Sequence, residues 1–181
     1  MRHVDWNNIP DSSQFSNPAP GGYIAQIVNV EDVEDKEYLR IEWDFVEAPY
    51  KGYCFDKKSN YGYWPIVLIR SYKEKALPFF KGFKTAVEKS NRNYVFNDQD
   101  VRGLRGKYFG VVLGEEEYIK RDGSIGTRLY VAENRSTDAI KSNDYSTPEL
   151  KKLENRASAQ FAALDNNNDL PWDDTDEEVP F

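Results

Sequence analysis

The sequence has few of the side chains on which most enzymes and metal sites depend. It contains one cysteine, Cys54, and one histidine, His3, so no intramolecular disulfide can form, and neither a histidine-dependent triad nor a zinc site is expected. Neither a GxxxxGK(S/T) phosphate loop nor a GxGxxG dinucleotide motif occurs. The sequence therefore predicts a protein that is not an enzyme and that holds no metal or cofactor.

Long apolar runs are also missing. The longest run, residues 66–69, is far short of the roughly 20 residues that a membrane-spanning helix needs. The first ten residues are polar and lack the apolar stretch of a secretory signal peptide. Together with the single cysteine, these observations predict a cytoplasmic protein with no membrane partner.

The formal net charge is −7, but it is unevenly distributed along the 181 residues. Residues 1–50 hold ten acidic and three basic residues, and residues 165–181 hold seven acidic residues and no basic one. Residues 51–109, in contrast, hold thirteen basic and five acidic residues. Because a polyanion responds to the local basic surface rather than to the total charge, the middle third is where a nucleic acid would bind.

Hydrophobic periodicity predicts a mainly β fold. Residues 38–47 alternate cleanly, with Leu39, Ile41, Trp43 and Phe45 on one face. Five strands are expected: residues 23–30, residues 38–47, an interrupted third strand made of residues 53–57 and 64–70, residues 107–116 and residues 127–133. An amphipathic helix is expected within residues 75–91, and the aromatic residues expected in the core are Trp43, Phe55, Phe79, Phe80 and Phe83.

The order of these elements is three strands, one helix and a two-stranded hairpin that turns at Asp122-Gly123. This order predicts an OB-fold, a five-stranded Greek-key barrel with a helix between strands three and four. A second amphipathic helix is expected over residues 148–164. The predicted organisation is an N-terminal arm (1–20), an OB-fold domain (21–140), a linker with the amphipathic helix (141–164) and a disordered acidic tail (165–181).

Cations and aromatic rings alternate in the basic middle of the chain, a combination typical of proteins that bind single-stranded nucleic acid. Cations neutralise phosphates, and exposed rings stack on bases that a duplex would hide. The candidate nucleic-acid-binding residues are Lys57, Lys58, Tyr61, Tyr63, Trp64, Arg70, Lys107, Tyr108, Arg121, Arg128 and Tyr130. The sequence leaves open whether Tyr61, Tyr63 and Trp64 stack on bases or pack in the protein, and whether Lys57 and Lys58 are ordinary surface lysines.

Residues 165–181 combine seven carboxylates with a terminal Val-Pro-Phe. A hydrophobic ring beside a chain-terminal carboxylate fits a basic pocket on another protein, although a solubilising tail that happens to end in phenylalanine is the alternative. The candidate partner-binding residues are Asp173, Asp174, Asp176, Glu177, Glu178, Val179, Pro180 and Phe181.

The opening PGGYIAQIVNVED followed by YLRIEWDFVEAPYKG, together with the tail DDTDEEVPF, resembles single-stranded DNA-binding proteins of the bacteriophage or prophage type. The resemblance implies a protein of the bacterial host cytoplasm that coats and protects single-stranded DNA during replication, recombination and repair. It also implies that the tail recruits partner enzymes, and it leaves homo-oligomer formation open. The alternative is an OB-fold protein-interaction module of a replication or recombination complex, without strong DNA binding.

Overall fold

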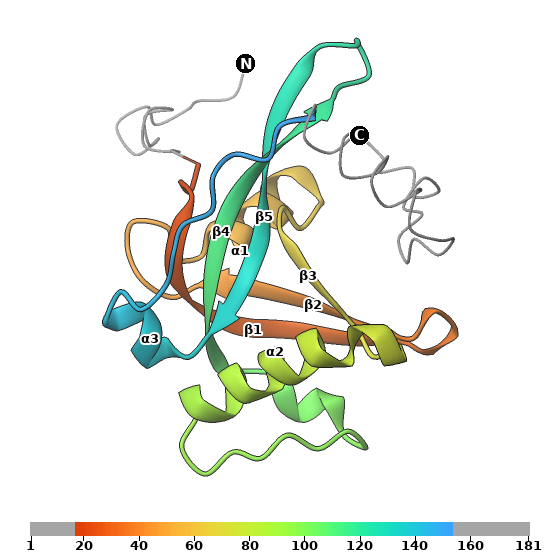
Figure 1. The fold of residues 1–181 in the computed structure, drawn as a ribbon, viewed down its shortest axis with the longest axis vertical. Coiled ribbons are helices and arrows are strands. Elements are labelled where there is room, and N and C mark those ends of the chain that lie inside the picture. Colours follow the sequence, from red (N-terminus) through yellow and green to blue (C-terminus); the bar gives the residue numbers. More distant parts are fainter. Residues whose placement is uncertain (1–16, 154–181) are drawn as a thin grey trace, which may run out of the picture.

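The structure is a computed structural model that describes residues 17–153. These residues form a mainly β protein with one five-stranded antiparallel sheet, in the order β3-β2-β1-β4-β5, and a few helices (Figure 1). The strands are β1 (Gly21–Val33), β2 (Tyr38–Phe45), β3 (Val67–Ser71), β4 (Tyr108–Ile119) and β5 (Ile125–Arg135). The helices are α1 (Tyr53–Tyr61), α2 (Leu77–Ser90) and α3 (Thr137–Lys141), with short 3-10 turns at Glu34–Lys36, Glu74–Ala76 and Val101–Leu104.

The predicted alternation of β2 is confirmed, because all four of its apolar side chains are buried on one face. Trp43 is fully buried at the centre of the core. Its ring lies edge-on to Phe109 of β4, with ring centroids 6.3 Å apart, and Phe109 in turn lies edge-on to Phe83 of α2 at 5.7 Å. The sheet and α2 therefore share one aromatic core.

The expected third strand is only half correct. Residues 53–57 form the first part of α1, and β3 begins later, at Val67, opposite Glu42 of β2. Gly52, which takes the left-handed conformation with φ of 79°, directly precedes the first residue of α1. The helix then leaves Phe55 exposed, so its expected place in the core is wrong.

The expected helix within residues 75–91 is confirmed as α2, with Pro78 in its first turn. Phe83 and Val87 are fully buried and Phe80 is partly buried. Phe79, which was expected in the core, is 75% exposed. Neighbouring residues on a helix point about 100° apart, so the burial of Phe80 turns Phe79 outward.

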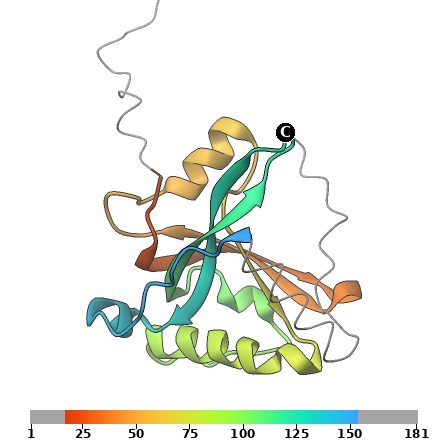
Figure 2. The same cartoon turned by 45° about the horizontal axis from the view of Figure 1, so that its top comes forward.

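Strands β4 and β5 extend beyond the core as a long hairpin (Figure 1). Its turn lies at the predicted Asp122-Gly123, where the Lys120 backbone N–H donates to the Ser124 carbonyl at 2.8 Å and Gly123 has a φ of 80°. The α1 and α2 helices lie on opposite sides of the strands, and the hairpin rises beside α1 (Figure 2).

Residues 148–152 were expected to begin a helix, and this expectation is wrong. They run extended beside β4, where Lys151 donates its backbone N–H to the Glu115 carbonyl at 3.0 Å and accepts from the Glu117 N–H at 2.9 Å. This edge of β4 is open because β1 starts at Gly21, opposite Leu113. The remainder of that expected helix, most of the N-terminal arm and the acidic tail lie outside the described residues.

Within residues 17–153, no helix is long and apolar enough to cross a membrane. The same range contains no group of three or more His, Cys, Asp or Glu side chains that could hold a metal ion.

Candidate nucleic-acid interface

The helix α1 is held on the sheet by a buried carboxylate. Asp44, near the end of β2, accepts hydrogen bonds from the backbone N–H groups of Cys54 at 3.0 Å and Phe55 at 2.9 Å. A carboxylate at a helix N-terminus satisfies otherwise unpaired N–H groups and interacts favourably with the helix dipole. Burial and the neighbouring Asp44 raise the pKa of the Cys54 thiol well above its ordinary value, so this cysteine remains protonated and its role is packing.

The outer side of α1 and the loop after it present exposed aromatic rings. Phe55, Tyr61 and Tyr63 are 59%, 64% and 49% exposed. The Tyr61 and Tyr63 rings lie 6.3 Å apart, centroid to centroid, and the Lys57 ammonium lies 5.3 Å from the Tyr61 ring centroid. Tyr61, Tyr63 and Lys57, which we call the α1 face, combine the two features that stacking and phosphate binding require.

Trp64 does not belong to the α1 face. Its side chain is buried, and its indole Nε1 donates a hydrogen bond to the Trp43 carbonyl at 3.0 Å. The Lys58 ammonium lies over the Trp64 ring, 5.3 Å from its centroid. Trp64 is therefore a packing residue, and the expectation that it stacks on a base is wrong.

The charge of Lys58 is already partly compensated. Its ammonium lies 3.6 Å from Glu42, a buried carboxylate that also accepts a 2.8 Å hydrogen bond from Arg40. Burial alone would raise the pKa of Glu42, but Arg40 and Lys58 outweigh this effect and hold that pKa below its ordinary value. Glu42 is thus ionised at neutral pH, and Lys57 is the less compensated cation of the two lysines on α1.

A groove of about 330 Å³ runs between the two edge strands, β3 and β5. Its β3 side begins at Pro65, two residues after Tyr63, and its β5 side includes Arg128 and Tyr130. The groove therefore begins in the chain segment that follows the α1 face, and its other wall belongs to the β4–β5 hairpin. The apolar residues of the groove are Ile66, Val67, Leu68, Ile69, Leu129 and Val131.

Arg70 lies in this groove but is held by the protein. Its guanidinium donates two hydrogen bonds to the side-chain carbonyl of Asn134 on β5, one of them at 3.0 Å, and a third to the Ile69 carbonyl at 2.9 Å. Burial lowers the pKa of Arg70 to about 10, so it stays charged at neutral pH. Its main role is to join the edge strands, which corrects the expectation of a phosphate contact.

The hairpin supplies the other cations. Arg128 is 61% exposed at its side chain and is paired with Glu116 at 2.8 Å, while its guanidinium lies 5.7 Å from the Tyr118 ring centroid. Arg121 is exposed in the hairpin turn. Lys151, which the sequence did not single out, reaches the hairpin because its segment pairs with β4.

Tyr130 is partly covered by its neighbours. A side chain at Gly114 would lie 2.8 Å from the ring, and the Lys151 ammonium lies 3.9 Å from the ring centroid. Lys151 occupies one face of the Tyr130 ring, and the residue lines the groove. The sequence could not show this packing because Gly114 and Lys151 are remote from Tyr130 in the chain.

Lys107 and Tyr108 lie elsewhere. Tyr108 begins β4 and its backbone is hydrogen-bonded in both directions to the Asn91 side chain at the end of α2. Glu116, the partner of Arg128, is eight positions further along the strand, which at about 3.3 Å per residue is roughly 26 Å away. The Lys107 ammonium lies 4.7 Å from the Tyr94 ring centroid. The structure thus separates these two residues from the hairpin cations with which they were grouped.

Of the predicted residues, Arg70, Arg128 and Tyr130 line the groove, whereas Lys57, Lys58, Tyr61 and Tyr63 lie on α1 and in the loop that leads to β3, and Arg121 lies in the hairpin turn. The sequence did not single out Lys151, and the exposure of Phe55 on α1 had no signal in the sequence because its strand-like neighbours suggested burial. The partner-binding candidates of the tail, residues 173–181, lie outside the described residues. No protein-family model matches the sequence, and no curated protein matches it either.

Proposed function

We propose that this protein binds single-stranded DNA without sequence preference, as a non-enzymatic OB-fold protein of the bacteriophage or prophage type. The observation that carries the proposal is the α1 face, with exposed Tyr61 and Tyr63 beside Lys57. The groove between β3 and β5 begins at Pro65, two residues after Tyr63, and contains Arg128. Exposed rings beside cations favour a ligand whose bases are unpaired. The acidic tail would recruit replication or recombination enzymes.

Three features of the fold support the OB-fold part of the proposal. The strand order β3-β2-β1-β4-β5 places β1 between β2 and β4, and the main helix, α2, lies between β3 and β4 in the chain. The hydrogen bonds from Arg70 to Asn134 join the two edge strands, as closure of a barrel would require. In OB-folds, a groove across such a surface receives oligonucleotides.

Binding to fluorescein-labelled oligo-dT, measured by fluorescence anisotropy at two salt concentrations, tests the proposal. If three phosphates are neutralised, affinity is expected to fall about 20-fold between 50 and 200 mM salt, because log K changes by about 0.7 per phosphate for each tenfold change in salt. Duplex DNA of the same length is expected to bind more weakly. Equal affinity for the duplex, or no binding at 50 mM salt, would overturn the proposal. Trp43 and Trp64 are buried, so anisotropy is preferable to tryptophan quenching.

Deleting residues 165–181 is expected to tighten oligo-dT binding by about threefold at low salt, because seven carboxylates would no longer compete for the same cations. The described chain supports such competition, since Lys151 pairs with β4 beside the hairpin and the tail follows fourteen residues later. The gain should vanish at 300 mM salt. A loss of affinity on deletion would contradict this competition.

The alternative, a protein-interaction module, is supported by the ion pairs of Lys58 with Glu42 and of Arg128 with Glu116, which reduce the charge open to phosphates. The two functions differ in the titration. A module without DNA binding gives no anisotropy change with oligo-dT, yet its tail still binds partners.

A further inference from the structure

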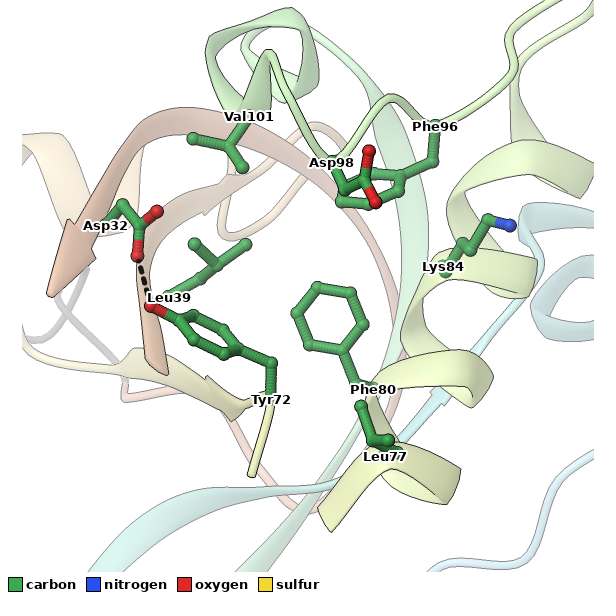
Figure 3. A pocket seen from close by; sticks show the side chains of 9 residues that line it. All are labelled: Asp32, Leu39, Tyr72, Leu77, Phe80, Lys84, Phe96, Asp98 and Val101. Carbon is green, nitrogen blue, oxygen red and sulfur yellow. Dashed lines mark hydrogen bonds between the residues drawn. The ribbon is translucent and has the colours of Figure 1, made fainter. Parts of the chain in front are cut away.

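A second cavity, of about 550 Å³, opens between α2, the ends of β1 and β3 and the segment that follows α2 (Figure 3). Rings line much of it: Phe80 lies edge-on to Phe96, with ring centroids 5.7 Å apart, and edge-on to Tyr72 at 6.5 Å. Leu39 contributes to the lining from the core, and Leu77 lies at the mouth, 47% exposed. Its volume is in the range of sites that hold a ligand's apolar part.

The mouth of this cavity is acidic. Asp32 and Asp98 are both exposed carboxylates that line it, and in Figure 3 the Lys84 ammonium points away from the rings. Lys84 also has its own partner, since its ammonium lies 3.8 Å from Glu88. The two aspartates therefore dominate the charge that a ligand entering the cavity would meet.

Tyr72 lies in the same negatively charged surroundings. Its hydroxyl donates a 2.9 Å hydrogen bond to Asp32 (Figure 3). Desolvation, this hydrogen bond and the charges of Asp32, Glu34 and Glu37 together raise the pKa of Tyr72 to about 12. An anion at this position would be repelled, whereas a cation would be attracted.

We propose that this cavity docks a basic peptide segment of a partner protein. One large apolar or aromatic side chain of the segment enters the ring-lined cavity, and a neighbouring lysine or arginine pairs with Asp32 and Asp98. The same charges disfavour the phosphates of a nucleic acid and the seven carboxylates of this chain's own tail. The cavity shares no lining residue with the groove between β3 and β5, so both can be occupied together.

Two matched peptides test the proposal by ¹H–¹⁵N correlation spectra of the full chain: acetyl-Gly-Leu-Trp-Arg-Lys-Gly-amide and the same peptide with Glu-Glu in place of Arg-Lys. The basic peptide is expected to shift the amide signals of Leu39, Phe80 and Phe96 and to bind at least tenfold more tightly than the acidic one. A peptide of residues 165–181 should leave these signals in place. Shifts caused equally by an acidic peptide, or no shift with the basic one, would overturn the proposal.

A double variant, Asp32→Asn with Asp98→Asn, separates charge from shape. Asparagine keeps the size of both side chains and an acceptor for the Tyr72 hydroxyl, so the spectrum of the free protein should stay close to that of the wild type. Affinity for the basic peptide is expected to fall about fivefold to tenfold, while oligo-dT binding stays unchanged. Unchanged affinity for the basic peptide in this variant would show that the carboxylates do not select the partner, and it would overturn the proposal.

Discussion

Replacing Tyr61 and Tyr63 together by alanine is expected to weaken oligo-dT binding by about 30- to 700-fold. Both rings are exposed on the α1 face, and a stacked base contributes about 1–3 kcal/mol, largely regardless of sequence. The two rings lie 6.3 Å apart, so their contributions are not fully additive, and a joint loss of about 2–4 kcal/mol corresponds to this range. Fluorescence anisotropy with labelled oligo-dT at 50 mM salt measures the loss.

The matched control is the double phenylalanine variant, which keeps both rings and removes only the hydroxyls, so most of the affinity should remain. Tyr108→Ala is the second control, because Tyr108 is similarly exposed, at 41%, but lies far along β4 from the hairpin cations. Its affinity should stay within about twofold of wild type, since no stacking contact is removed. An equal loss in Tyr108→Ala would place the ligand elsewhere, and full affinity in the double alanine variant would contradict stacking on the α1 face.

The strands could be predicted because apolar residues that face the core recur at every second position, as Leu39, Ile41, Trp43 and Phe45 do in β2. That signal located β2 at its correct first residue and β4, β5 and their turn to within a few residues. It failed for α1 because residues 53–57 are apolar and β-prone, whereas the helix depends on Asp44, about ten residues earlier in β2. Local periodicity carries no information about such a partner.

The site was predicted by region rather than by residue. The density of lysines and aromatic rings between residues 51 and 75 indicated the region that contains the α1 face. In the structure, the candidate residues of this region divide into those held inside the protein and those exposed to solvent. Trp64 and Arg70 are occupied by partners inside the protein, and Tyr61 and Tyr63 remain exposed. Which ring of a cluster is buried depends on contacts across the sheet, such as that between Trp64 and the Trp43 carbonyl, and these contacts are not encoded in the spacing of the residues.

The dependence of α1 on one carboxylate predicts that Asp44→Ala destabilises the protein. The substitution removes three hydrogen bonds, to the backbone N–H groups of Phe45, Cys54 and Phe55, in a site with little access to water. Leaving these donors without a partner is expected to lower the free energy of unfolding by about 3 kcal/mol. The melting temperature should fall by about 10 °C. Glu47→Ala, which removes an exposed carboxylate between β2 and α1, is the control and should change the melting temperature little.

The single cysteine distinguishes detachment of α1 from a general loss of stability. Cys54 is fully buried beneath the first turn of the helix, so in the folded wild type its thiol should react very slowly with a disulfide reagent. In Asp44→Ala, the reaction at a temperature well below melting is expected to be at least tenfold faster, because local opening of α1 exposes the thiol without unfolding the sheet. Oligo-dT affinity should fall in parallel, since α1 carries Lys57 and Tyr61. A slow thiol together with weakened DNA binding would show that Asp44 affects the ligand by a route other than holding α1 in place.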